Sequence, residues 1–455
     1  MSFLPTALLS SLKSIEGFDE PAFVAVHDSG EQIISVRLNP DKKVSNTLPI
    51  ANNVLWSSNG YYLFERPIFT LDPLLHAGAY YVQEASSMFL EEALKQSVDI
   101  SQPLKVLDLC AAPGGKSTLL QSIISPESLL VSNEVIKARV NILAENITKW
   151  GAANVVVTNN DPAHFKRLEN YFDVIVVDAP CSGSGLFRKD PEAIKEWSLN
   201  NVQLCSQRQQ RILSDILPSL KEGGKLIYST CSYSVEEDED IMNWLKQKFP
   251  LENVKLEINK DFGIVETHAD GNSGYRFYPD KIKGEGFFIA VFQKKITDIL
   301  SDRKIKAKAK STDQVNKNDI ETIRPFVNNV DELFFIKQAD EIIALPLQLK
   351  DELPVLQSAL YIKKAGIKIG SIIRNELLPD HELALSNIIN PDVISIEVDK
   401  TTALQYLRKE EIKIETTVKG WALIKYNGLP LGWIKILPNR SNNYYPKEWR
   451  ILMKS

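Results

Sequence analysis

At 455 residues the chain is too long for one ordinary hydrophobic core, so we expect two to four domains. Its net charge of −5 gives no global sign of a nucleic-acid partner, and any such binding would depend on local basic patches. The four cysteines lack short paired spacings and the five histidines are scattered, which argues against a disulfide scaffold or a metal site. No apolar run is long enough to span a membrane, and the N-terminus lacks a signal-peptide pattern, so we expect a cytoplasmic protein without a membrane partner.

Residues 1–95 are expected to form a small α+β domain. Leu4–Ser14 is apolar at helical spacing, and Gln32–Leu38 alternates like a strand. The segment His76–Met88 contains two adjacent tyrosines followed by a run of polar residues. Two interpretations stay open for it, an aromatic packing patch or a surface that faces a substrate.

Residues 96–295 alternate strands with helices, which is the pattern of a doubly wound, mostly parallel sheet. The expected strands are Leu104–Leu109, Leu129–Val131, Asn154–Thr158, Phe172–Ala179 and Lys225–Tyr228, and the helices between them are Ser117–Ile124, Lys137–Trp150 and Leu199–Leu220. Gly223-Gly224 should break the last helix, and Ser234–Glu237 has a capping-box pattern that predicts a helix start. Gly286–Gln293 reads as a late strand, which we expect at the other edge of the sheet.

The remaining sequence divides into a polar segment and a β-rich tail. Residues 296–319 are Lys-rich and predict a flexible linker, which could be a solvated tether or an RNA contact. Residues 320–455 contain short alternating runs and should form a compact β-barrel-like module. Asn427-Gly428 predicts a hairpin turn inside it.

A glycine-rich turn at Asp108–Thr118 (DLCAAPGGKST) joins the first expected strand to a helix. A phosphate-binding Walker loop would need a glycine where Cys110 stands, and the dinucleotide pattern GxGxxG is absent. Gly114 and Gly115 carry no side chains, so a ligand can approach the backbone there, and the helix N-terminus favours a carboxylate.

Acidic residues follow the next two expected strands. Glu134 can accept hydrogen bonds from both hydroxyls of a ribose, and Asp161 could meet the amine of an adenine. A ligand that contains a ribose, an adenine and an amino-acid carboxylate would satisfy these contacts, and S-adenosylmethionine contains all three groups. The alternative is that these acids merely cap helices.

Two cysteines follow the last two expected parallel strands. Cys181 comes after the strand that ends near Asp178, and Cys231 comes after the strand Lys225–Tyr228. Because the carboxyl ends of parallel strands meet at one edge of a sheet, the two cysteines could face one pocket.

Four motifs carry a family resemblance. CAAPGGK (Cys110–Lys116), DAPCSGSG (Asp178–Gly185), STCS (Ser229–Ser232) and RFYPDKIKGEGFFIA (Arg276–Ala290) resemble the signature motifs of the RNA (cytosine-5) methyltransferases of the Sun/Nop family. The likeness covers roughly residues 30–295. The tail, at Gly420–Lys435, is similar to the PUA-like RNA-binding extension of the bacterial small-subunit rRNA methyltransferase F group. The resemblance implies a Rossmann-like methyltransferase core, an N-terminal RNA-engaging domain and a C-terminal PUA-like domain.

The resemblance also implies a reaction, the transfer of a methyl group from S-adenosylmethionine to carbon 5 of a cytosine in RNA. We expect small-subunit rRNA or the small ribosomal subunit as the partner, and a monomeric enzyme. The implied cofactor contacts are Cys110, Ala111, Ala112, Pro113, Gly114, Gly115, Lys116, Glu134, Asp161 and Asp178. Two alternatives are a tRNA (cytosine-5) methyltransferase with the same core and an RNA-binding assembly factor without catalysis.

The family chemistry needs a thiolate that adds to carbon 6 of cytosine and so makes carbon 5 nucleophilic. In DNA cytosine methyltransferases this is the cysteine of a Pro-Cys pair, here Cys181. In the RNA family it is the cysteine of a Thr-Cys pair, here Cys231, and Cys181 would assist product release. The motifs favour Cys231, with Asp178 as a hydrogen-bond partner of the cytosine ring nitrogen. Ser182–Gly185 would form a flexible strand end that a flipped base can approach.

Other polar and sulfur-containing residues have less specific interpretations. Cys205 and Cys110 are expected to be packing residues, because a cysteine without a motif behaves as a small apolar side chain. Arg37 and Arg276 are candidate phosphate contacts. His76 is expected to be structural or exposed.

Overall fold

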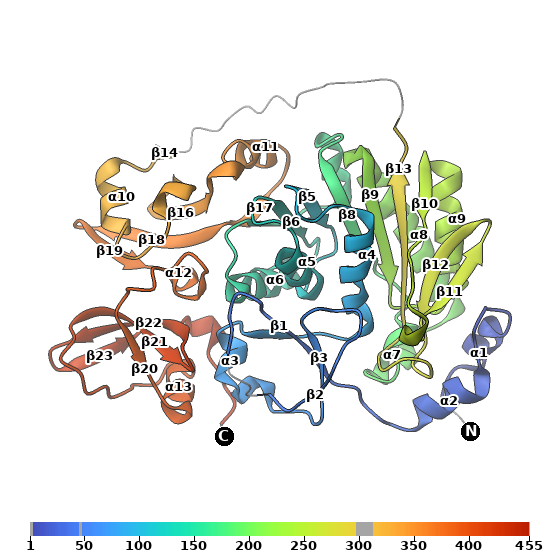
Figure 1. Ribbon diagram of the computed structural model, residues 1–455, viewed down its shortest axis with the longest axis horizontal. Coiled ribbons are helices and arrows are strands. Elements are labelled where there is room, and N and C mark those ends of the chain that lie inside the picture. Colours follow the sequence, from blue (N-terminus) through green and yellow to red (C-terminus); the bar gives the residue numbers. More distant parts are fainter. Residues whose placement is uncertain (1–2, 45–47, 297–312, 455) are drawn as a thin grey trace.

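The computed structural model describes residues 3–44, 48–296 and 313–454, which contain four sheets (Figure 1). The N-terminal sheet has the order β2-β3-β1-β4 and is antiparallel where its strands pair. Its strands are β1 Ser35–Leu38, β2 Ile50–Asn53, β3 Gly60–Leu63 and β4 Tyr80–Val82, and α3 Pro73–His76 packs beside it. The helices α1 Thr6–Leu12 and α2 Glu20–Asp28 pack instead against the central region, near Trp197 and Tyr278. The expected small α+β unit is therefore present.

A ten-stranded sheet forms the centre of the molecule, with the order β11-β12-β13-β9-β8-β5-β6-β7-β17 and β10 paired to β13. Its strands are β5 Lys105–Asp108, β6 Leu129–Asn133, β7 Val155–Thr158, β8 Phe172–Asp178, β9 Leu220–Thr230, β10 Leu251–Val254, β11 Val265–Ala269, β12 Asn272–Phe277, β13 Phe287–Lys294 and β17 Ile362–Ala365. Its helices are α4 Leu90–Ser97, α5 Gly115–Ile123, α6 Lys137–Trp150, α7 Glu192–Glu196, α8 Leu199–Ile216 and α9 Glu239–Lys248. The five strands β5–β9 run parallel, as the alternating pattern predicts.

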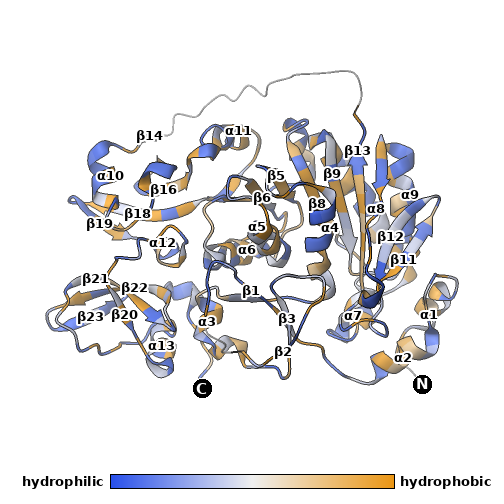
Figure 2. Ribbon diagram, in the orientation of Figure 1, coloured by the Kyte–Doolittle hydropathy of each residue, from blue (hydrophilic) through white to orange (hydrophobic). Residues whose placement is uncertain are grey.

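Buried apolar side chains cover both faces of this sheet, because its parallel strands are hydrophobic along their whole length. Figure 2 shows the hydrophobic residues gathered where α5 and α6 meet the sheet. Two local predictions are wrong. The strand at Phe287–Lys294 lies between β9 and β12 and not at an edge, since the chain turns back to add antiparallel strands beyond it. Gly223-Gly224 lies inside β9 and not before it.

The C-terminal residues form two sheets, where one compact module was expected. The first contains β14 Asp313–Gln314, β15 Leu333–Gln338, β16 Glu341–Pro346, β18 Ile367–Ile373 and β19 Glu376–Pro379, and the second contains β20 Ser395–Glu397, β21 Gly420–Tyr426, β22 Leu429–Leu437 and β23 Arg440–Asn443. The helices are α10 Lys317–Ile323, α11 Glu352–Ala359, α12 His381–Leu385 and α13 Lys400–Leu407. The predicted hairpin at Asn427-Gly428 is confirmed, because both residues have positive φ between paired β21 and β22.

The C-terminal chain is joined to the central sheet at its edge. Strand β17 pairs antiparallel with β7 and so extends the ten-stranded sheet. The Lys42 ammonium is buried and donates to the carbonyls of Ala77, Lys149 and Leu385 at 2.8, 2.5 and 2.7 Å. These carbonyls lie at or next to the ends of α3, α6 and α12, so one side chain ties three regions together. Most of the predicted linker, residues 297–312, lies outside the described residues, and the domain boundaries stay a prediction.

Among the residues that the structure describes, we find no helix that is both long and apolar enough to cross a bilayer.

Candidate active site

The glycine-rich turn after β5 shapes one wall of a cavity at the carboxyl ends of the parallel strands. Gly114 has φ +119°, a left-handed conformation that L-residues rarely adopt, and α5 begins at the next residue. A Cβ on Gly115 would lie 3.3 Å from the Tyr81 ring, so the missing side chain keeps the backbone open to the cavity. The sequence prediction of a strand, a glycine turn and a helix is confirmed here.

This cavity has a volume of about 320 Å³ and brings most of the predicted site residues together. The predicted residues that line it are Cys110, Ala111, Ala112, Pro113, Gly115, Lys116, Asp178 and Cys231. Residues of the His76–Met88 segment also line it, namely Tyr81, Val82, Gln83, Glu84 and Ser87, and the other lining residues are Arg139, Leu186, Lys189, Glu285, Gly286 and Phe287. Of the two interpretations of that segment, the lining favours the one in which it faces a ligand.

An ion pair crosses the cavity wall between the first and second motifs. Lys116 Nζ lies 2.8 Å from Asp178 Oδ2, and Ser229 Oγ donates to Asp178 Oδ1 at 2.9 Å. Burial lowers the pKa of Lys116, but the Asp178 carboxylate more than offsets this and leaves the pKa raised overall. Lys116 is therefore a cation that is held at the cavity wall.

The two motif cysteines lie together after β8 and β9, although only one of them lines the cavity that both were expected to face. Cys181 Sγ lies 3.0 Å from Cys231 Sγ, and both thiols are free. Cys231 lines the cavity, whereas Cys181 is not among the lining residues. The hydrogen bond between the two thiols, together with burial, raises the pKa of Cys181 well above its ordinary value. Cys181 is thus a protonated neighbour of the cysteine that a ligand can reach.

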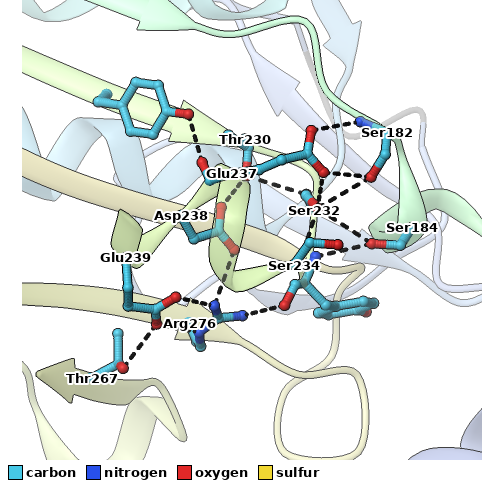
Figure 3. A network of polar contacts seen from close by, with 12 residues as sticks. Ser182, Ser184, Thr230, Ser232, Ser234, Glu237, Asp238, Glu239, Thr267 and Arg276 are labelled. Carbon is cyan, nitrogen blue, oxygen red and sulfur yellow. Dashed lines mark hydrogen bonds and ion pairs between the residues drawn. The ribbon is translucent and has the colours of Figure 1, made fainter. Parts of the chain in front are cut away.

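A buried carboxylate, Glu237, holds the loops that carry both cysteines (Figure 3). Its oxygens accept hydrogen bonds from Ser182 N at 2.8 Å and Ser182 Oγ at 2.5 Å. They also accept from Ser232 Oγ at 2.6 Å and from Gln209 Nε2 at 3.1 Å. Since Ser182 follows Cys181 and Ser232 follows Cys231, one side chain fixes both loops.

Two sequence predictions fail at this carboxylate. The segment Ser182–Gly185 is not a loose strand end, because Ser182 is bonded to Glu237 and Ser184 Oγ accepts from Tyr233 N at 2.9 Å. The capping box is also wrong, because Ser234 makes no cap hydrogen bond and its hydroxyl is buried without a partner. Glu237 turns inward to the serines instead.

A second carboxylate that the sequence interpretation missed is Asp108, at the end of β5. It is fully buried, accepts from Ser117 Oγ at 2.7 Å through one oxygen and leaves the other oxygen without a partner. Burial raises its pKa to about 7. The sequence does contain a signal for Asp108, because an acid at the end of a buried strand, directly before a glycine turn, lies at the edge of the sheet where ligands bind.

The remaining predicted cofactor residues lie outside the cavity lining. Glu134 is 3% exposed, accepts from Ile136 N at 2.8 Å and lies 3.6 Å from Arg139. Asp161 accepts from Ala163 N at 3.0 Å and pairs with Arg211 at 3.4 Å. Asp161 thus makes the helix cap that the alternative interpretation gave both acids, whereas Glu134 makes only a local backbone bond and α6 has no side-chain cap. Gly114 also lies outside the lining.

Arg37 and Arg276 are not surface phosphate contacts, because each is only 1% exposed. Arg37 donates to Gln83 and Thr118, and Arg276 pairs with Asp238 and Glu239. Their charges are used to join elements inside the protein. Cys205 is buried on α8, as expected of a packing residue, and His76 is buried with Nε2 at 3.0 Å from the Thr70 carbonyl.

Three family models match successive parts of the chain. The model of the N-terminal domain of 16S rRNA methyltransferase RsmF matches residues 4–85. The model of 16S rRNA methyltransferase RsmB/F matches residues 97–293, and that of the methyltransferase RsmF PUA domain matches residues 393–451.

Relatives with the name ribosomal RNA small subunit methyltransferase F match most of the chain. The protein of Shewanella woodyi is 30% identical over 408 residues, which cover 86% of this chain and 84% of the relative. That of Shewanella piezotolerans is 29% identical over 410 residues, with the same coverage.

Solved structures share the fold of about two thirds of the chain. A methyltransferase homolog protein from Pyrococcus horikoshii is 26% identical with a TM-score of 0.52, and the match covers 64% of this chain and all of that one. NSun6 from Pyrococcus horikoshii with SFG is 18% identical with a TM-score of 0.54, over 64% of this chain and 99% of that one, which shows a shared fold.

The fold and the site define an S-adenosylmethionine-dependent methyltransferase. The chain belongs to the 16S rRNA methyltransferase RsmB/F family. The predicted family, Rossmann-like fold class and cofactor are therefore confirmed. The residues present fit this cofactor, since the turn at Gly115 is open to the cavity and Asp108 keeps one buried oxygen unpartnered.

Proposed function

We propose that the protein methylates carbon 5 of a cytosine in small-subunit rRNA, with Cys231 as the nucleophile. The observation that carries this proposal is that Cys231 lines the same cavity as the glycine-rich turn and the Lys116–Asp178 pair. The names of the relatives support the rRNA substrate, and the match to a PUA domain supports an RNA partner. The predicted monomeric state and cytoplasmic location stay predictions.

S-adenosylmethionine supplies an electrophilic methyl group when bound. We propose that it is held by Cys110–Lys116 together with Glu134, Asp161 and Asp178. Asp161 and Glu134 each accept a backbone hydrogen bond through one carboxylate oxygen, and an arginine lies near the other oxygen. A ribose or an adenine would have to compete with these arginines.

The position of Cys231 on the cavity wall supports the following proposed chemistry. The Cys231 thiolate would add to carbon 6, and the electron pair of the 5,6 double bond would move toward carbon 5. Lys116 and Asp178 lie on the cavity wall and would hydrogen-bond the ring as charge builds up on it. After methylation the carbon-5 proton leaves, the carbon–sulfur bond breaks and the ring double bond forms again.

Cys181 is suited to a supporting role in this cycle. Its thiol stays protonated because its pKa is raised by the contact with Cys231 and by burial. At 3.0 Å it can donate a hydrogen bond to the sulfur of Cys231, which stabilises the thiolate before addition and again on release. Cys181→Ala should therefore accumulate a covalent protein–RNA adduct, and Cys231→Ala should form none.

The test is methyl transfer from labelled S-adenosylmethionine to naked small-subunit rRNA, small ribosomal subunits and tRNA. The wild type should label small-subunit rRNA at a cytosine, Cys231→Ala should lose the label, and Cys205→Ala, a buried cysteine on α8, should keep it. Label in tRNA alone would contradict the rRNA substrate. RNA binding without label on any RNA would favour the assembly-factor alternative, and label on another atom would contradict carbon 5.

A further inference from the structure

The two motif cysteines have contacting sulfurs and similar partial burial, but they differ in their position relative to the cavity. Cys231 lines the cavity, and Cys181 does not. A reagent that enters the cavity therefore meets Cys231 first. The sulfur of Cys181 is 3.0 Å away on the neighbouring strand end, ready to react with whatever forms on Cys231.

The protein holds this pair in place on several sides. The Glu237 carboxylate accepts hydrogen bonds from the residue that follows each cysteine. In addition, Gly185 N donates to the Cys231 carbonyl at 2.8 Å. The last bond joins the two loops directly. A Cβ on Gly185 would lie 2.5 Å from the Gly286 carbonyl oxygen and 2.8 Å from that of Cys231, so the loops are packed closely. The sulfur–sulfur contact is thus a property of two fixed loops.

We propose that Cys181 and Cys231 form a redox-modification site that reacts with hydroperoxides to give a reversible disulfide. With hydrogen peroxide, the Cys231 thiolate attacks one oxygen, the oxygen–oxygen bond breaks, and Cys231 becomes a sulfenic acid while hydroxide leaves and takes up a solvent proton to form water. The Cys181 sulfur then attacks the Cys231 sulfur, the sulfur–oxygen bond breaks, and a second water leaves. Two thiols are oxidised by two electrons, and hydrogen peroxide is reduced to two waters.

The arrangement separates an attacking from a resolving cysteine, as peroxide-sensing proteins do. Cys181 would capture the sulfenic acid before it is oxidised further to the irreversible sulfinic and sulfonic acids. The disulfide itself does not depend on the proposed methylation. Only the expected loss of methyl transfer rests on the proposed function, because a disulfide-bonded Cys231 has no thiolate to add to cytosine.

The experiment treats the full-length protein with hydrogen peroxide in the absence of RNA, alkylates the remaining thiols and maps the cysteine peptides by mass spectrometry. We expect one disulfide, between Cys181 and Cys231, and at least a tenfold loss of methyl transfer that dithiothreitol restores. Cys205→Ser should form the same disulfide. In Cys181→Ser, Cys231 should proceed to sulfinic and sulfonic acid.

Overoxidation of Cys231 in the wild type without a disulfide would overturn the proposal, as would a disulfide that involves Cys110 or Cys205. If Cys181→Ser does not fold, phenylarsine oxide provides a second measurement on the wild type. It should bind one to one and protect both cysteines from alkylation, and protection of neither would count against the pair. A reversible disulfide in a protein that never transfers methyl groups would contradict the proposed function and leave the redox site intact.

Discussion

The two sides of the cavity are stabilised in different ways. On the cysteine side, the buried Glu237 carboxylate receives four hydrogen bonds. On the cofactor side, the buried Asp108 carboxylate receives one, from Ser117, and keeps an oxygen without a partner. Burial raises the pKa of both acids. The cysteine side is therefore fixed by the protein itself, and the cofactor side keeps polar capacity that a ligand can use.

The largest expected effect is that of Glu237→Leu. The change leaves four donors around Ser182, Ser232 and Gln209 without an acceptor in the core, so we expect unfolding to become easier by about 3–5 kcal/mol. Methyl transfer should be lost with it. Chemical denaturation measures the stability, and labelled cofactor measures the activity.

Glu237→Gln is the matched control, because it keeps the side-chain volume. Its single amide oxygen can accept at most two of the four hydrogen bonds that Glu237 accepts. We expect it to fold, to bind S-adenosylmethionine within about twofold of the wild type, and to turn over about 10²-fold more slowly, since a small misplacement of reacting groups has that cost. Normal turnover in Glu237→Gln would show that the network does not position the cysteines.

The next largest effect is expected for Lys116→Met. This change removes the ion pair between Lys116 and Asp178, which joins the two sides of the cavity. We expect kcat to fall by about 10²-fold, because Asp178 would then face the cavity with Ser229 alone. Lys95→Met is the control, because it breaks the 2.6 Å pair with Glu91, which is not part of the cavity lining. Equal kcat losses in the two variants would mean that charge pairing matters only for folding.

Asp108→Asn tests the cofactor side through pH. The pKa of Asp108 is raised to about 7 from 3.8, so between these values the folded state binds more protons than the unfolded state, and stability falls as pH rises through this window. The slope that this group contributes is at most about 1.4 kcal/mol per pH unit. The asparagine variant should lose that slope in denaturation curves between pH 4 and 7. An unchanged slope would mean that Asp108 titrates normally.

Much of this architecture could be predicted from the sequence, because periodicity and strand-end chemistry are local signals. The parallel strands, the helix Lys137–Trp150 and the meeting of Cys181 with Cys231 all follow from such signals. The local pattern predicts Glu237 as part of a helix cap, because such a pattern cannot show that two serines from distant loops offer better partners. Arg37 and Arg276 are candidate phosphate contacts by sequence but are buried in the structure, because burial depends on contacts between distant segments.

The smallest expected effect is that of Thr267→Val, at the far end of the network in Figure 3. Thr267 Oγ1 donates to Glu239 Oε1 at 2.9 Å, and Glu239 keeps its pairing with Arg276 when this bond is removed. Because the charge stays paired, we expect a loss of about 1 kcal/mol in the free energy of unfolding. Turnover and peroxide-driven disulfide formation should not change. If either changed as much as in Glu237→Gln, the polar network would act on the cysteines as one unit, and the special position of Glu237 between the two loops would no longer explain their geometry.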